Sequence, residues 1–496
     1  MSTLRTKTQS LITTLLGLPL GALLFGCLVG PKYAVPVVPA PPAYKELPSA
    51  ELASGVRWSA ATPADAMARG SWWEIFGDPQ LNALEAQIVI SNQNIAAAAA
   101  NYAAARAIVR ETRSQYFPSL TAGASISYSR VSVFPAANVS SGTTYTEYSL
   151  PVEASWEPDL WGKVRNSVHS AVFAAQADAA TLANVRLAEQ AQLAMDYYLV
   201  RAQDVLAKVL DDAVLSDQQT FDLTQTLYRA GLTTDEAASA AEAQLRAVQA
   251  QRENVRITRA EYEHAMAMLL GKAPADFSLS VTTDALVPPE IPVTVPAELL
   301  KRRPDIAAAE RTLASANAQI GIATSAYFPN IVLSGTAGFT GLSAADWFTW
   351  PSRIWAVGPA ITQTLFDAGL RRATTQQYRS QYEAAVASYR QTTLIAFQQV
   401  EDSLVASRVL RGELDQQNRA VAAAQRAFDE ATVRYRAGLD PYLNVIQAQQ
   451  TLLSYQDNAV QIRSQQMTAA VQLIQALGGG WSAQQLPSAR AVAQGH

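Results

Sequence analysis

The 496-residue sequence has one cysteine, three histidines and no familiar catalytic motif. A single cysteine excludes an intramolecular disulfide framework. The histidines, His169, His264 and His496, are too scattered for a histidine-rich metal site. There is no His-Glu-x-x-His motif, no phosphate-binding glycine loop and no Gly-x-Ser-x-Gly motif. We therefore expect no enzyme activity, no metal and no cofactor.

Excess positive charge and long apolar segments are also missing. The net charge is −4, so nothing indicates a nucleic-acid partner. After residue 27 no stretch reaches about 18 uninterrupted apolar residues, so we expect no transmembrane helix in the mature chain. Strict leucine heptads are absent as well, which disfavours an ordinary coiled-coil dimer.

Residues 1–26 are predicted to be a lipoprotein signal peptide. Arg5 and Lys7 give a positive start, and residues 11–25 are apolar and uncharged. The segment ends in Leu-Phe-Gly followed by Cys27, which resembles a bacterial lipobox and makes Cys27 the expected lipidation site. Leucine rather than aspartate follows this cysteine, which favours the outer membrane. The alternative is an uncleaved anchor helix, but the apolar run is short for a span and a proline interrupts it.

Residues 27–70 are expected to form a lipid-anchored, extended arm. Six prolines lie between residues 31 and 48, a density typical of a semi-rigid polyproline segment. A lipid anchor holds a protein to a membrane but does not span it.

The sequence repeats itself at a spacing of about 200 residues. The phrase Tyr-Arg-Ala-Gly-Leu begins at Tyr228 and again at Tyr435, and Tyr-Phe-Pro begins at Tyr116 and again at Tyr327. This spacing indicates one unit used twice and not a solenoid array. We divide the chain into a first repeat (71–271, tip at 231), an equatorial linker (272–297), a second repeat (298–477, tip at 438) and a C-terminal tail (478–496).

Four segments alternate between apolar residues and small or polar ones, with aromatic residues near their ends. That pattern is typical of strands between lipid and water, although strands of a soluble sheet packed on helices are the alternative. The expected strands cover about 117–134, 144–158, 329–341 and 353–366.

Four strands cannot close a barrel, and an open sheet edge in lipid leaves backbone groups unpaired. Neighbouring chains must then supply further strands. Since the smallest closed barrels of about eight strands are filled by their own side chains, we expect three chains, twelve strands and a lumen; two chains are not excluded by the arithmetic.

Two very long helices are predicted at residues 163–230 and 369–437, because neither run contains proline. Each would be roughly 100 Å long at about 1.5 Å per residue. Their surfaces are rich in Ala, Gln, Arg and Glu, which suits helices packed side by side in a tube with water inside and outside.

Each long helix is expected to end at a repeated glycine and turn into a returning helix, at about 235–270 and 441–477. In the first tip, Thr233 and Glu236 fit a capping box. In the second tip, Asp440 fits an N-cap before Pro441 at the first helical position.

Several phrases together resemble the TolC-type outer-membrane efflux channels, specifically the lipoprotein branch that serves tripartite drug pumps. The resemblance covers nearly the whole mature chain. Its marks are Gly30-Pro31, Tyr33, residues 72–81 (WWEIFGDPQL), 157–165 (EPDLWGKVR), 299–306 (LLKRRPDI), both Tyr-Arg-Ala-Gly tips and 477–481 (LGGGW).

This resemblance implies a mixed α and β membrane protein that is a homotrimer. It implies a twelve-stranded outer-membrane β-barrel, four strands per chain, continued by a twelve-helix periplasmic α-barrel. The tips would dock to a periplasmic adaptor protein and, directly or indirectly, to an inner-membrane transporter. The chain would be a passive exit duct for small toxic compounds. A protein-secretion duct and a lipid-anchored scaffold without a pore are the alternatives.

The family's gate lies near the second tip, and the matching positions here are Tyr435, Leu443, Asn444 and Gln447. Leu443 and Gln447 are four residues apart and share one helical face. Many relatives carry aspartate where Gln447 stands, and some also at Asn444. The neutral amides of this chain put a cation-selective gate in doubt.

The remaining candidate residues surround the two tips. The acidic ones, Asp235, Glu236 and Asp440, either belong to the gate or serve only as helix caps. The residues expected to face the adaptor are Arg229, Gly231, Leu232, Arg436, Gly438 and Leu439.

Overall fold

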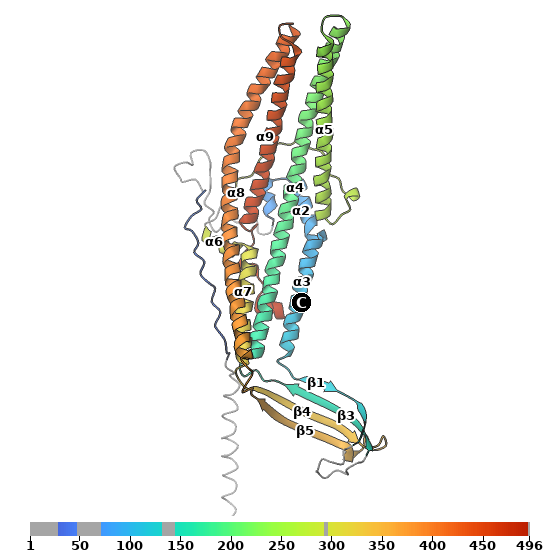
Figure 1. The fold of residues 1–496 in the computed structure, drawn as a ribbon, viewed down its shortest axis with the longest axis vertical. Coiled ribbons are helices and arrows are strands. Elements are labelled where there is room, and N and C mark those ends of the chain that lie inside the picture. Colours follow the sequence, from blue (N-terminus) through green and yellow to red (C-terminus); the bar gives the residue numbers. More distant parts are fainter. Residues whose placement is uncertain (1–27, 47–70, 131–143, 292–295, 495–496) are drawn as a thin grey trace, which may run out of the picture.

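The computed structural model describes residues 28–46, 71–130, 144–291 and 296–494. They form an elongated molecule with a β-sheet at one end and the tips of two long helical hairpins at the other (Figure 1). The expected signal peptide, Cys27 and the second half of the arm lie outside the described residues.

The two hairpins make up most of the length. The first joins α4 (Lys163–Arg229) to α5 (Asp235–Leu269), and the second joins α8 (Leu370–Arg436) to α9 (Tyr442–Ala476). Both α4 and α8 have 67 residues, and both α5 and α9 have 35. The long helices coincide with the proline-free runs to within one residue. Across the molecule the order is α8, α9, α4, α5 (Figure 1).

Shorter helices precede each hairpin. In the first half they are the 3₁₀ turn η1 (Trp72–Phe76), α2 (Pro79–Ser91) and α3 (Gln93–Ser114). In the second half they are α6 (Pro296–Arg302) and α7 (Pro304–Ser325). Both α3 and α7 have 22 residues and run from the middle of the molecule to the sheet.

Residues 79–114, a stretch rich in alanine that favours one helix, form two helices separated at Asn92. Asn92 leaves the helical region with ψ of 127°, and its Oδ1 accepts a hydrogen bond from the Ile95 N–H at 2.9 Å. Its amide also donates to the Leu269 carbonyl at 2.9 Å. Asn92 therefore ends α2 and caps α3, because its side chain competes with the helical backbone.

The sheet is antiparallel throughout and is formed by β1 (Ser119–Ala122), β2 (Ser125–Arg130), β3 (Thr144–Trp156), β4 (Asn330–Gly341) and β5 (Arg353–Thr362). Its order is β1-β3-β4-β5, and β2 also pairs with β3. Thus β1 and β2 are two parts of one edge strand. A 3₁₀ turn, η3 (Trp350–Ser352), leads into β5.

Two strand predictions need correction. The expected first strand is interrupted at residues 123–124, where the Gly123 N–H bonds to the Pro151 carbonyl at 3.0 Å outside the regular ladder. Residues 131–134 of that strand lie outside the described residues. The expected fourth strand ends at Thr362, four residues early.

The strand register aligns the apolar residues on one face. Leu120 lies opposite Ala154, Ala154 opposite Gly335, and Gly335 opposite Val357. Leu120 and Val357 are 73% and 78% exposed, so none of the described helices covers this face. The predicted alternation is confirmed. The same face carries Ile126, Tyr128, Leu150, Val152, Trp156, Leu333, Phe339, Trp355 and Ile361.

The main hydrophobic core lies where the short helices meet the long ones. Trp72, Leu193, Tyr197, Leu299 and Leu473 are all nearly fully buried there. Because these residues come from both halves of the sequence, this core joins the two hairpins at mid-length.

Two arginines, the buried Arg201 and the half-buried Arg259, hold the linker after α5 against the helices. After the 3₁₀ turn η2 (Pro274–Asp276), Arg259 donates to the Leu279 carbonyl at 2.8 Å and Arg201 to the Ser280 carbonyl at 2.6 Å. Both guanidinium groups also bond the buried carboxylate of Asp204. The linker is thereby held against α4 and α5.

The described part of the arm, residues 28–46, is extended and packs along the helices. Asn166 donates to the Val29 carbonyl at 2.9 Å, and Asn317 donates to the Pro31 carbonyl at 3.0 Å. The Val29 N–H bonds to Trp161 at the junction between β3 and α4. The arm therefore begins at the sheet end of the molecule (Figure 1).

The C-terminal segment also packs back on the helices. It contains η4 (Ala483–Gln485) and α10 (Ala489–Gln494). Val492 is fully buried beside Val109 and Val168, and so ties the segment to α3 and α4.

Candidate functional site: the helical tips

Both hairpins turn through the same backbone geometry. Gly231 and Gly438 have φ of 74°, in the left-handed region that favours glycine. The Leu232 N–H bonds to the Leu227 carbonyl at 2.9 Å, and the Leu439 N–H bonds to the Arg434 carbonyl at 2.9 Å. These Schellman bonds satisfy the helix-end carbonyls and turn the chain sharply. The predicted glycine stops are confirmed.

The tips expose large side chains. Leu232 is 74% exposed and Leu439 69%, and neither glycine has an atom within 4 Å of where a Cβ would lie. Arg229 and Arg436 are exposed and form no ion pair with the described part of the chain. Apolar and cationic groups are thus free for contacts beyond this chain.

The first returning helix is capped by a neighbour of the predicted residue. Thr234, not Thr233, is the N-cap, and its hydroxyl accepts from the Ala237 N–H at 3.3 Å. Glu236 is then the second helical residue, so the expected capping box is wrong. Asp235 and Glu236 remain exposed in the first turn, where negative charge stabilises a helix.

The second tip is fastened by an ion pair that the sequence interpretation missed. Arg434 Nε donates to Asp440 Oδ2 at 2.6 Å, and its Nη2 donates to Oδ1 at 3.2 Å. Arg434 thereby holds the pKa of Asp440 below its usual value, with a smaller contribution from Asn444. The expected N-cap role of Asp440 is wrong, because Pro441 is the N-cap and the carboxylate faces Arg434.

Tyr435 joins the two hairpins close to the tip. Its hydroxyl lies 3.1 Å from Thr224 Oγ1, and Thr224 donates its own proton to the Thr220 carbonyl at 2.8 Å. Tyr435 is therefore the donor in the contact between α8 and α4. Its ring also packs on Tyr442, with centroids 5.1 Å apart.

The other gate candidates face away from this contact. Leu443 is 58% exposed, and Asn444 and Gln447 are exposed on the same side of α9. Nothing in the described chain covers them, so one apolar and two amide side chains are presented on the surface one to two turns from the second tip.

A buried polar cluster lies deeper between the hairpins. Gln449 of α9 donates to Asp217 of α4 at 2.5 Å, and Gln450 donates to Gln244 of α5 at 3.1 Å. The sequence interpretation missed this cluster, because single polar residues in a helix rich in Gln, Arg and Glu carry no sign of burial.

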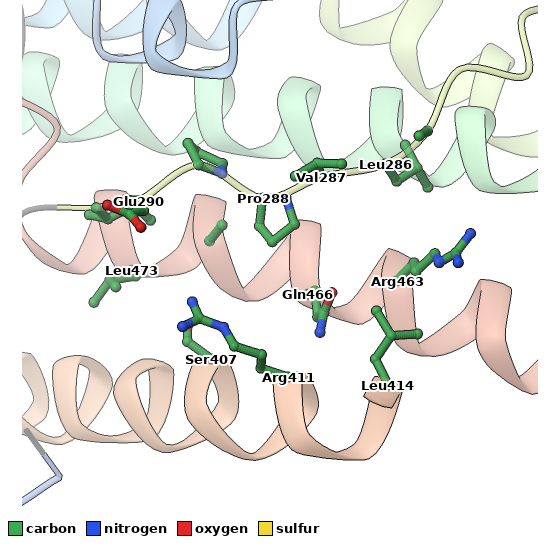
Figure 2. A pocket seen from close by; sticks show the side chains of 14 residues that line it. Leu286, Val287, Pro288, Glu290, Ser407, Arg411, Leu414, Arg463, Gln466 and Leu473 are labelled. Atoms are coloured by element: carbon green, nitrogen blue, oxygen red, sulfur yellow. The ribbon is translucent and has the colours of Figure 1, made fainter. Parts of the chain in front are cut away.

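A groove lies far from the tips, between the linker and helices α8 and α9. Its volume is about 500 Å³. Figure 2 shows the linker residues Leu286, Val287 and Pro288 on one side and Arg411 and Leu414 of α8 on the other. Its lining is largely apolar, and it shares no residue with the tips.

No helix in the described ranges is apolar over enough residues to cross a bilayer. Across those same ranges, no three His, Cys, Asp or Glu side chains gather in a way that would hold a metal ion.

A sheet with an uncovered apolar face at one end, and long hairpins with exposed tips at the other, are the features expected of a channel-type outer-membrane protein. Residues 85–272 and 295–479 match the model of the outer membrane efflux protein family. The chain belongs to this family.

Known relatives agree over nearly the whole chain. It is 31% identical over 462 residues to the probable efflux pump outer membrane protein TtgC of Pseudomonas putida, covering 92% of this chain and 94% of that protein. It is 32% identical over 446 residues to the pyoverdine export outer membrane protein OpmQ of Pseudomonas aeruginosa, covering 88% and 92%.

The solved structure of the outer-membrane channel OprN is similar at a TM-score of 0.82 and 30% identity, covering 92% of this chain and all of that one. The protein is thus an outer-membrane efflux component that extends into the periplasm, and its family consists of efflux ducts, not enzymes.

Proposed function

We propose that this chain is the outer-membrane exit duct of a tripartite efflux pump, through which small toxic compounds leave passively. The observation that carries this proposal is the combination of an uncovered apolar sheet face with hairpins about 100 Å long that end in exposed tips. A lipid-facing sheet continued by a water-filled tube of helices would give solutes a continuous path from the periplasm to the exterior.

The open sheet edges support a trimer. In the described chain β5 pairs only with β4, and the β1/β2 strand pairs only with β3. In lipid each unpaired backbone group costs several kcal/mol. Three copies with four strands and four long helices each would close a twelve-stranded barrel and a twelve-helix tube.

Equal element lengths support an internal duplication. The helices α3 and α7 match at 22 residues, α4 and α8 at 67, and α5 and α9 at 35. We assign residues 71–271 and 298–477 to the two repeats. Each repeat then supplies two strands and one hairpin, so three chains form a pseudo-sixfold tube.

The path of the arm supports lipidation at Cys27. The arm begins beside Trp161, where the sheet meets the helices. An acyl chain on Cys27 would enter the outer membrane there, at the level where the apolar sheet face ends.

Closure at the second tip is proposed to depend on Tyr435, Leu443, Asn444 and Gln447. The bond from Tyr435 to Thr224 holds the second hairpin against the first. Three copies of Leu443 would form an apolar constriction with amide rings of Gln447 and Asn444 beside it. Amides carry no charge, so the closed pore would repel ions by its narrowness and not by a charged ring.

The exposed tips are the proposed docking surface for the periplasmic adaptor protein, with the inner-membrane transporter beyond it. Leu232 and Leu439 offer apolar contacts, and Arg229 and Arg436 offer unpaired cations. Gly231 and Gly438 let a partner approach the backbone closely. Asp235 and Glu236 make the first tip more acidic than the second, where Arg434 neutralises Asp440.

Deletion of the gene in its host tests this function. The deletion strain should accumulate a fluorescent pump substrate and become more sensitive to solvents or antibiotics. Wild-type protein should reverse both effects. A Leu232→Asp/Leu439→Asp variant should reach the outer membrane normally yet fail to restore efflux, because its docking surface is altered.

A deletion strain with unchanged tolerance and dye accumulation would contradict the proposal. Full restoration by the tip variant would keep the duct but remove the tips as its docking surface. Folded protein that forms no pores would favour the scaffold without a pore.

A further inference from the structure

Asp217 is buried where three long helices meet, about two turns from the contact between Tyr435 and Thr224. Its exposed fraction is 2%, and those of Gln449 and Gln244 are 3% and 6%. These two amides come from α9 and α5, so the carboxyl group sits directly at the seam between the hairpins.

Only one of the two carboxyl oxygens of Asp217 has a hydrogen-bond partner among the described residues. Its Oδ1 accepts from Gln449, but its Oδ2 is buried and has no hydrogen-bond partner among the described residues. Burial raises the pKa of Asp217, and the amides of Gln449 and Gln244 oppose that rise without cancelling it. The Gln244 amide lies nearby, although no hydrogen bond joins it to Oδ2.

Among the described residues, no neighbouring cation lowers the pKa of Asp217. The titratable side chain facing it from α9 is Tyr442, whose own pKa is raised mainly by burial and further by Asp217. Tyr435 of α8 packs on Tyr442, and α5 contributes the neutral Gln244. On α4 itself, Asp212 forms an ion pair with Lys208, which lies one turn before it in the helix.

A buried carboxylate with one unpaired oxygen is less favourable than either a fully satisfied network or an apolar contact. Water would satisfy the free oxygen if the hairpins moved apart. A cavity of about 180 Å³ already lies beside the cluster, lined in part by Ser216 and Gln449. The route for water to Asp217 is therefore short.

We propose that Asp217 is a positioning residue that makes the closed contact between the two hairpins metastable, so that ionised Asp217 favours their separation. The inference rests on the proposed duct function. It gives two of the contacts between the hairpins opposite effects. The neutral hydrogen bond from Tyr435 to Thr224 holds the tip closed, and the carboxylate of Asp217 favours its opening.

The sign of the pH effect follows from the burial. Since the acid form is favoured in the closed packing, closure is strongest at low pH and weakens as pH rises through the pKa of the buried group. Asp217→Asn carries the neutral form at every pH and should keep the contact closed.

Single-channel recordings on the full-length protein test this directly. At neutral pH, Asp217→Asn should lower the open probability several-fold, and acidification should lower that of the wild type toward the same level. The variant itself should show no such pH response. Asp222→Asn removes the same charge from an exposed site on α4 and should behave as wild type.

Hydrogen exchange at residues 445–452 of α9 provides a readout that needs no pore. At neutral pH the Asn variant should exchange several-fold more slowly than wild type. If no pores form, the duct function fails while exchange still decides the role of Asp217. The inference would be overturned if wild type and Asp217→Asn had equal exchange rates and equal open probabilities. It would also be overturned if Asp217→Asn were the more open of the two, because Asp217 would then hold the hairpins together.

Discussion

Replacing Glu85 should stabilise the protein, and more so at higher pH. Glu85 lies on α2 with 0% exposure, in the same apolar layer as Leu81, Leu84 and Ile88. Both of its carboxyl oxygens are buried without a hydrogen-bond partner in the described structure. Burial raises the pKa of Glu85 well above its usual value.

The magnitude follows from the unpaired oxygens. Leaving a buried polar group unsatisfied costs about 1–3 kcal/mol. Glu85→Met keeps a similar shape without polar oxygens, so it should recover about that amount at a pH where the acid is neutral. The gain should increase at higher pH, because the folded protein must then bury a charge or hold a proton that the unfolded chain has released.

The pH dependence has a definite sign. The unfolded glutamate ionises near pH 4.3, below the folded group. The contribution of Glu85 to stability is therefore greatest below about that pH and falls as pH rises toward the folded pKa, by at most about 1.4 kcal/mol per pH unit. Glu85→Gln does not titrate, so its advantage over wild type should grow over the same range.

Thermal unfolding in detergent, followed by far-ultraviolet circular dichroism at one scan rate, measures the effect. Glu111→Gln, the same charge change at an exposed site on α3, is the control and should leave the midpoint nearly unchanged. A Glu85→Gln midpoint that is lower than wild type at neutral pH, or offset from it equally at all pH values, would refute the reasoning.

Three further changes test other parts of the account. Tyr435→Phe should weaken closure by about 1 kcal/mol and raise the frequency of channel opening in bilayer recordings. Tyr228→Phe, the counterpart in the first hairpin, should leave that frequency unchanged, and equal opening frequencies for the two variants would contradict this. Gly338→Ala should lower the yield of folded membrane-inserted protein, because a Cβ there would lie 2.2 Å from a carbonyl oxygen of β3, and Gly358→Ala, with open space around it, should not. Cys27→Ser should abolish incorporation of labelled palmitate, and retained label would place the lipid elsewhere or show that the segment is not a lipobox.

Much of the fold follows from local sequence chemistry. The long helices could be predicted because proline is absent from them and Gly231 and Gly438 end them. The apolar sheet face could be predicted because alternation in a strand sets which side a residue faces. Both features depend on residues close together in the sequence.

The errors come from choices that only the folded backbone makes. Thr233 and Thr234 are adjacent and equally able to cap, and the turn geometry selects Thr234. Asp440 is drawn away from its expected cap by Arg434, six residues earlier across the turn. Asp217 meets Gln449 from the other repeat, 232 residues away, so no local pattern reveals the pair.

Planar-bilayer recording of the purified protein tests the central claim most directly. The account predicts stable pores of low conductance, and a changed conductance for Gln447→Asp, which adds an acidic side chain to each copy near the second tip. Gln465→Asp, an exposed site about five turns further along α9, should leave the resting conductance nearly unchanged. Well-folded, membrane-inserted protein that forms no pores would contradict the account.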